Sequence, residues 1–164
     1  TPADLKGMKV RVMQSNLHIA IWESLGAIPS AIAFGELYTA LSQGTVDAQD
    51  NPLELVISQK FYEVQKYITL TNHIFQVGMA TCNPAWFNSL SAEDQQVVMD
   101  AIRAGVEFQR KEAAAQKENY ITTLEDAGLT VITLTDAELA EFQALMGSAE
   151  DVIATNVGAD LAVS

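Results

Sequence analysis

The feature that most constrains the fold is a long helical pattern in the second half of the chain. It starts at residues 91–94 (SAED), a capping-box-like pattern, and continues without proline to about Ala127, where Gly128 is a stop signal. A helix of about 35 residues is roughly 50 Å long at a rise of 1.5 Å per residue. That length exceeds the diameter of a compact domain of this size. We therefore expect the helix either to bridge two lobes or to protrude from one.

The remainder of the chain alternates strand and helix patterns. Short strand patterns occur at residues 9–12, 28–33, 45–49, 66–70, 74–83 and 130–133. Helical patterns occupy 15–25 and 35–43, and Asn51 followed by Pro52 suits the N-cap and first position of a third helix. Thr135 opens a last capped helix. Such alternation favours parallel βαβ units, which predicts an α/β fold with a parallel or mixed sheet flanked by helices.

The charge balance excludes several kinds of partner. Hydrophobic residues make up 49% of the chain, as in a folded protein, and 9 Lys and Arg against 21 Asp and Glu give a formal net charge of −12. Such a chain cannot form the basic surface that nucleic acid requires, nor a basic amphipathic membrane helix. No apolar run is long enough to cross a bilayer, and the first residues do not form a signal peptide. A small anionic ligand would therefore need a local, sheltered positive group.

Arg11 is the best candidate for that group. It is the only arginine in the first 102 residues and ends the apolar strand pattern at 9–12. Its planar guanidinium matches a carboxylate or phosphate through two parallel hydrogen bonds. In open parallel sheets, ligands bind at the carboxyl ends of the strands, where Arg11 and Asn51 both fall. A surface or ion-paired role for Arg11, and helix capping alone for Asn51, are the structural alternatives.

The sequence shows no pattern typical of a catalytic or metal site. There is no nucleophile–base pair, glycine-rich phosphate loop or Cys/His metal cluster. Glu36 and Glu63 are interpreted as helix-start and surface charges, and Asp47 with Asp50 supplies too few oxygen ligands for a metal ion. Cys82 is the only cysteine in the sequence, so it cannot form a disulfide within the chain. It is expected to be a small buried residue. We predict no catalytic residue, no metal and no cofactor.

Four consecutive blocks resemble motifs of the solute-binding proteins of TRAP transporters, the DctP type. They are residues 34–41 (FGELYTAL), 44–52 (GTVDAQDNP), 60–67 (KFYEVQKY) and 70–73 (LTNH). The strand at 9–12 lies at the family's upstream position, and the long capped helix follows where expected. Two departures are mild: Ala48 replaces a usual glycine, and Asp50 replaces a frequent glutamate.

The resemblance implies a periplasmic receptor with two α/β lobes around a cleft. Such a receptor captures a small organic acid anion through its carboxylate and delivers it to the membrane permease subunits of the transporter. Arg11 matches the arginine that pairs with the carboxylate, and Asn51 matches the asparagine that hydrogen-bonds the ligand. Phe34 matches an aromatic wall of the cleft, and Gln14 falls where some members place a polar contact.

Family members are about twice as long, so the chain resembles their C-terminal half. By this comparison residues 1–76 form a C-terminal ligand-binding lobe, and residues 77–116 are a hinge strand and long helix that pack with the N-terminal lobe. Residues 117–164 return to the C-terminal lobe. Two alternatives to a solute receptor remain open. One is a truncated lobe that self-associates or acts as an interaction module, and the other is an enzyme on the same fold.

Overall fold

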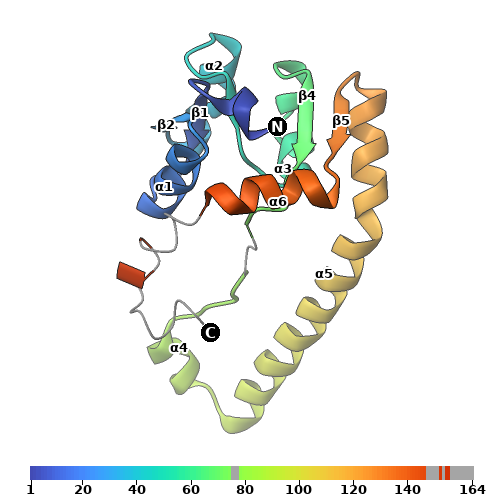
Figure 1. Ribbon diagram of the computed structural model, residues 1–164. Coiled ribbons are helices and arrows are strands. Elements are labelled where there is room, and N and C mark those ends of the chain that lie inside the picture. The colour runs from blue at the N-terminus through green and yellow to red at the C-terminus, as the bar shows by residue number, and fades with distance from the viewer. Residues whose placement is uncertain (75–77, 147–151, 153, 156–164) are drawn as a thin grey trace. The chain divides into compact units, whose positions relative to one another are not determined.

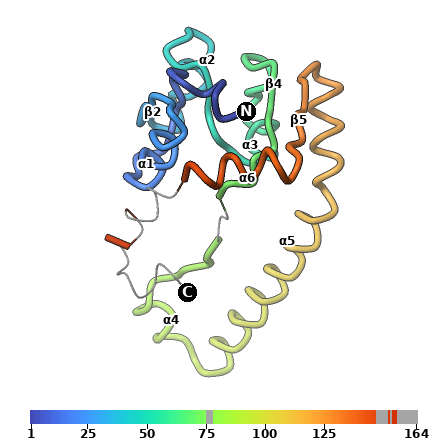
Figure 2. The backbone as a smooth tube through the Cα atoms, in the orientation of Figure 1, coloured from blue at the N-terminus to red at the C-terminus, as the bar shows by residue number. Residues whose placement is uncertain are grey.

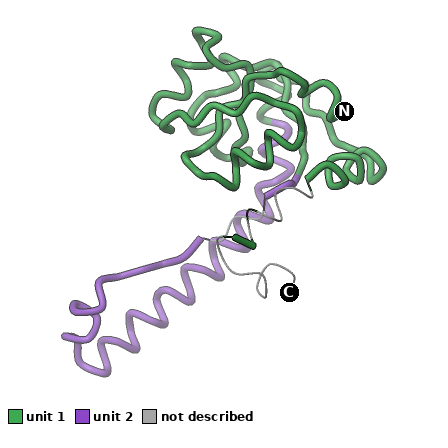
Figure 3. Tube along the Cα trace, turned by 60° about the vertical axis from the view of Figure 1, so that its left-hand side comes forward, with its two compact units in different colours: residues 1–71, 123–164 green, residues 72–122 purple. Residues whose placement is uncertain are grey.

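A computed structural model describes residues 1–74, 78–146, 152, 154 and 155 (Figure 1). The chain divides into two compact units, which are coloured separately in Figure 3. The first unit combines residues 1–71 with 123–164 and contains both sheets, and the second unit comprises residues 72–122. Both sheets are parallel and packed with helices, so the predicted α/β class is confirmed.

The first sheet is parallel and has the strand order β2-β1-β3. Its strands are β1 (Lys9–Val12), β2 (Ile28–Ala31) and β3 (Ala48–Gln49). The register places Arg11 of the central strand opposite Ser30 on one side and Gln49 on the other. Pro29 lies in β2, an edge strand, where a missing backbone N–H is tolerated. The three strands therefore end at one edge of the sheet, with Arg11 close to it.

Short helices precede, connect and follow these strands. They are η1 (Pro2–Leu5), α1 (Asn16–Ser24), η2 (Phe34–Glu36), α2 (Leu37–Ser42), α3 (Leu53–Ser58) and η3 (Phe61–Glu63). Gly26 ends α1 with a φ of 82°, a conformation that side-chain-bearing residues rarely adopt. β3 is shorter than the predicted strand at 45–49, because the N–H groups of Thr45 and Val46 bond back to the carbonyl of Ala40 at the end of α2.

Figure 2 labels the two strands of the second sheet, β4 (Tyr67–Leu70) and β5 (Thr130–Thr133). They pair in parallel, with Tyr67 opposite Thr130. The predicted strand at 74–83 is wrong for the residues that are described there, 74 and 78–83, which belong to neither sheet. A strand needs a hydrogen-bonded neighbour, and β4 and β5 pair with each other instead. Cys82 in this segment is exposed, so its expected burial is wrong as well.

The long helix is confirmed as α5 (Ala92–Asp126), which has 35 residues. Its start is capped as predicted, because the hydroxyl of Ser91 accepts the N–H of Asp94 at 3.1 Å. The shorter α4 (Pro84–Ser89) precedes it, and α6 (Asp136–Leu145) follows β5 with the expected capping box at Thr135.

Two buried clusters form the core of the first unit. The first joins β1, α1 and α6 through Val10, Val12, Ile21, Trp22, Leu25, Ala27 and Phe142. The second joins α2, α3, η3 and the end of α5 through Leu37, Ala40, Leu41, Val46, Val56, Phe61, Leu124 and Leu129. In contrast, none of the described residues in 72–122 is buried. The second unit thus has no described core of its own.

Candidate ligand-binding site

The candidate site lies at the carboxyl edge of the first sheet, where parallel strands direct the residues that follow them to a shared edge. Arg11 lies one residue before the end of β1, Phe34 follows β2, and Asn51 follows β3. All three belong to the first unit. The strand register thus brings together the segments that carry three of the four predicted binding residues.

Arg11 is held from two directions. It is 5% exposed, and among the described residues no other charged or polar residue is so buried. Its Nε–H donates to the carbonyl oxygen of Ile32 at 2.9 Å, and its guanidinium carbon lies 5.8 Å from the centre of the Phe34 ring. Burial lowers the pKa of Arg11, and the nearby Asp50 carboxylate opposes that shift. Among the hydrogen bonds described for Arg11, none involves either Nη atom.

Phe34 contacts both the buried Phe61 and the guanidinium of Arg11. Its ring packs edge-on against the ring of Phe61, with 6.1 Å between the centroids and an interplanar angle of 78°. Phe61 is 1% exposed, whereas Phe34 is 39% exposed. The ring of Phe34 is therefore anchored on one side and open on another, so it is not a plain core residue.

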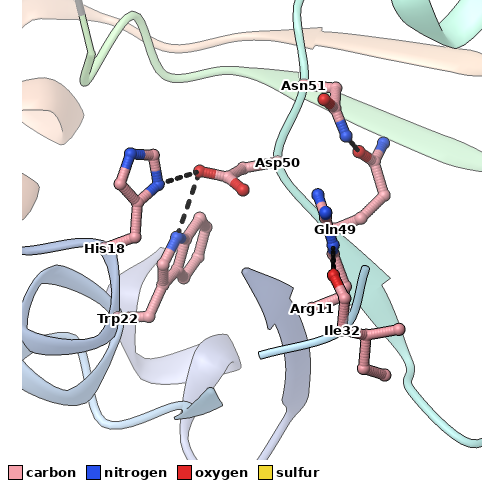
Figure 4. A network of polar contacts seen from close by, with 7 residues as sticks. All are labelled: Arg11, His18, Trp22, Ile32, Gln49, Asp50 and Asn51. Atoms are coloured by element: carbon pink, nitrogen blue, oxygen red, sulfur yellow. Dashed lines mark hydrogen bonds and ion pairs between the residues drawn. The ribbon is translucent and has the colours of Figure 1, made fainter. Parts of the chain in front are cut away.

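Asn51 is part of a chain of side-chain amides. Its Nδ2 donates to Oε1 of Gln49, and Nε2 of Gln49 donates to Oε1 of Gln65 at 3.0 Å (Figure 4 shows the first of these contacts). The helix that follows has Pro52 at its N-cap and no side-chain capping bond. The structural alternative for Asn51, capping of α3, is therefore wrong, because Pro52 takes the N-cap position and no described backbone N–H donates to Oδ1 of Asn51.

Asp50 lies between these amides and α1, a role that the sequence did not indicate. Figure 4 shows its carboxylate facing two side chains of α1, His18 and Trp22. Trp22 Nε1 donates to Oδ2 of Asp50 at 3.3 Å, and Nδ1 of His18 lies 3.7 Å from the same oxygen. His18 and Trp22 are four residues apart and share one helix face. That spacing was the available signal, but only the tertiary structure supplies the carboxylate partner.

Gln14 stands apart from the other predicted residues. It is exposed in the bend after β1, and in the described part of the chain no hydrogen bond joins it to Arg11, Phe34 or Asn51. Gln49, by contrast, was missed. A signal existed, since residues opposite each other on neighbouring strands point to the same face of a sheet, and Gln49 is opposite Arg11.

The carboxylates considered as catalytic or metal-binding candidates include two, Glu63 and Asp47, that accept structural hydrogen bonds. Glu63 accepts the hydroxyl of Tyr38 at 2.7 Å, which raises the pKa of that tyrosine, and Asp47 accepts the backbone N–H of Lys9 at 2.9 Å. Among the described residues no three His, Cys, Asp or Glu side chains gather as metal ligands would. In the same part of the chain, no helix has both the length and the apolar character needed to cross a membrane.

Comparisons with known proteins agree with this architecture. The family described as bacterial extracellular solute-binding protein, family 7 (DctP), matches residues 1–155. A solute-binding protein of Verminephrobacter eiseniae is 43% identical over 131 residues, covering 80% of this chain and 39% of that protein. The 2,3-diketo-L-gulonate-binding periplasmic protein of Escherichia coli K12 is 39% identical over 163 residues, covering 98% of this chain and 49% of that protein.

A solved structure gives the same result in three dimensions. It is a TRAP periplasmic solute-binding protein from Polaromonas sp. JS666 bound to D-erythronate. It is 34% identical with a TM-score of 0.88, covering 98% of this chain and 52% of that one. The chain thus spans about half the length of the relatives it matches. With the family matched over nearly all of its length, the chain belongs to the DctP family of solute-binding proteins of TRAP transporters.

Proposed function

We propose that this chain captures a small organic acid anion through its carboxylate, as part of a periplasmic receptor that delivers the anion to the permease subunits of a TRAP transporter. The observation that carries the proposal is the geometry of Arg11. A buried guanidinium with its Nε edge fixed by Ile32 and its Nη edge without a described partner is suited to a bidentate carboxylate. No catalytic role is proposed.

Arg11 would contribute the charge-assisted bonds, and its neighbours would shape the site. Phe34 would form an aromatic wall beside the guanidinium, and Asn51 would donate its second Nδ2–H to the ligand. Gln14 would contribute only on rearrangement of its bend, because it is exposed and no described hydrogen bond joins it to the others. Charge-assisted bonds of this kind gain most when closure of the cleft excludes water.

The ligand class follows from the site and from what the relatives bind. D-erythronate and 2,3-diketo-L-gulonate, named for two relatives, each combine a carboxylate with adjacent oxygen groups. One buried guanidinium and one amide suit such a monocarboxylate.

We further propose that residues 77–116 pack against a second lobe of the receptor, with 1–76 and 117–164 forming the lobe that holds Arg11. The absence of any buried described residue in 72–122 supports this, since a helix without a core must bury its apolar side chains elsewhere. The share of the relatives' length that the chain spans is consistent with it.

A second candidate is self-association of the 164-residue chain when it is produced alone. Large apolar side chains of the second unit are exposed: Met79 at 81%, Phe108 at 66%, Val97 at 62% and Trp86 at 48%. Such surfaces favour association. Sedimentation velocity should show species larger than the monomer that disperse when Phe108→Ser is introduced, whereas a single monomer boundary would exclude this candidate.

Calorimetric titration of the full-length receptor with D-erythronate and succinate tests the main proposal. Arg11→Ala should weaken carboxylate binding by about 3–5 kcal/mol, the range for removing one partner of a buried ion pair. Arg11→Lys should also bind weakly, because an ammonium lacks the planar fork. Lys6→Ala is the control, since it removes a positive charge from an exposed position of the same unit. Unchanged affinity in folded Arg11 variants would overturn the assignment.

A further inference from the structure

We infer that Gln49 and Gln65 are positioning residues that set the direction of the Asn51 side-chain amide beside Arg11; the inference rests on the proposed function. The observation is the chain of hydrogen bonds that runs from Asn51 through Gln49 to Gln65. Its members come from the end of β3, the loop between β3 and α3, and the segment before β4. The bond between Gln49 and Gln65 spans 16 positions in sequence, so it ties two distant segments together.

The chain of amides has a direction. Gln49 uses its Oε1 to accept from Asn51 and its Nε2 to donate to Gln65, so both ends of its amide are engaged. Asn51 retains its second Nδ2–H and its Oδ1. A free asparagine amide has a broad, nearly twofold torsion and could present either end to a ligand. Because Oε1 of Gln49 is an acceptor, the Asn51 amide turns its Nδ2 group, and not its Oδ1, toward Gln49.

The strand register gives this selection a functional meaning. Gln49 is opposite Arg11 on the neighbouring strand, so the two side chains share a face of the sheet. The Nδ2 group of Asn51 is therefore directed toward the side chain next to Arg11. The Arg11 guanidinium and the second Nδ2–H of Asn51 would both act as donors to a ligand, which favours an anion over a neutral ligand. Gln65 acts at the far end, where it restrains Gln49 without taking part in the site.

The energetic consequence is preorganisation. An amide that is already restrained before binding loses less rotational freedom when the ligand arrives. Removing the restraint should leave all ligand-contacting residues in place yet weaken binding. A single neutral hydrogen bond supports an effect on the order of 3- to 10-fold in affinity.

Gln65 is the site for the test, because it is partly buried and lies outside the proposed contacts. Gln65→Met keeps the size of the side chain and removes the acceptor for Gln49. Gln65→Glu keeps that acceptor and serves as the conservative rescue. Gln49→Met removes both bonds at once and provides a second break in the chain. Thermal unfolding establishes that each variant is folded.

The primary readout is the side-chain amide signal of Asn51 in ¹⁵N-labelled full-length receptor, identified by its loss in Asn51→Asp. In Gln65→Met and Gln49→Met the Asn51 signal should shift and its hydrogens should exchange with solvent faster, whereas Gln65→Glu should resemble the unsubstituted protein. An Asn51 signal that is unchanged in both methionine variants would overturn the inference.

Affinity for D-erythronate is the second readout, and it separates two kinds of failure. A Gln65→Met variant with a shifted Asn51 signal and 3- to 10-fold weaker binding supports a positioning role. A shifted signal with unchanged affinity shows a purely structural bond and overturns that role. If the unsubstituted receptor binds neither D-erythronate nor succinate, the proposed function fails for these acids, and the amide signal still decides whether Gln49 and Gln65 orient Asn51.

Discussion

Arg11 and Ile32 are joined by a hydrogen bond of 2.9 Å from the guanidinium Nε to the backbone carbonyl oxygen. Ile32 is the first residue after β2, the edge strand beside β1, so the bond links the end of one strand to the side chain of the next. The contact fixes the plane of the guanidinium and occupies its Nε–H. The remaining edge, with both Nη atoms, is the one that matches a bidentate anion.

Phe34 should affect binding through its ring more than through its size. Phe34→Leu removes the aromatic face 5.8 Å from the Arg11 guanidinium carbon, whereas Phe34→Tyr retains it. Calorimetry of the full-length receptor with D-erythronate should show a loss of about 0.5–2 kcal/mol for the leucine variant. The tyrosine variant should bind almost as the parent does. Equal losses in the two variants would instead indicate that the shape of this wall, and not its ring, matters.

Asp50 should stabilise the fold through α1. Asp50→Asn keeps the shape but removes the charge that faces Trp22, His18 and Arg11. Because hydrogen bonds to charged groups contribute more than neutral ones, we expect a loss of about 1–2 kcal/mol in the free energy of unfolding by urea. Asp47→Asn is the control, since its carboxylate is exposed and accepts only from the Lys9 backbone among the bonds described. A larger loss in the control would contradict the special role of Asp50.

The end of α5 should carry most of that helix's contribution to the stability of the first unit. Leu124 is fully buried in the cluster with Phe61, whereas Val97 near the start of α5 is 62% exposed. Leu124→Ala should lower the free energy of unfolding by about 2–5 kcal/mol, because it leaves a cavity. Val97→Ala should change it by no more than about 0.5 kcal/mol. Urea unfolding followed by circular dichroism measures both, and similar values for the two would show that Leu124 is not part of a tight core.

The capping box of α6 should make the unfolding midpoint of the protein depend on pH in the acid range. The N–H and hydroxyl of Thr135 donate to the Glu138 carboxylate and lower its pKa. A carboxyl with a lowered folded-state pKa stabilises the fold above its unfolded pKa, and that contribution is lost as the pH falls through the folded value. Glu138→Gln should therefore lower the unfolding midpoint at neutral pH, with the difference shrinking toward a pH of about 3.

Glu141→Gln makes the same charge change on an exposed position of the same helix. Its midpoint should differ little from that of the parent at either pH. A Glu138→Gln effect that stays constant down to the acid range would contradict the linkage to the carboxyl pKa.

The amino-acid sequence determined the features that depend on neighbouring residues. The long helix, its Ser91 cap, the Thr135 capping box and the strand at 130–133 were all predicted, because capping and periodicity act within a few positions. The position of Arg11 near a strand end follows from the same local pattern. Local signals were weaker where a second segment had to supply a partner: β3 is shorter than predicted, and 74–83 is not a strand in its described part.

Only the tertiary structure decided how the candidate site is assembled. The sequence placed Arg11 and Asn51 at strand ends but left structural roles for both open. Arg11 is buried only in the folded chain. Its bond to Ile32, the bond from Gln49 to Gln65 and the contacts of Asp50 with α1 each join positions that are 16 to 32 residues apart in the sequence. Such contacts depend on strand register and on the packing of separate elements, which no short stretch of sequence specifies. Asn51 is an example, because local propensity makes asparagine a good N-cap. In the structure it does not cap α3 but donates to Gln49, since the end of β3 brings that acceptor within reach.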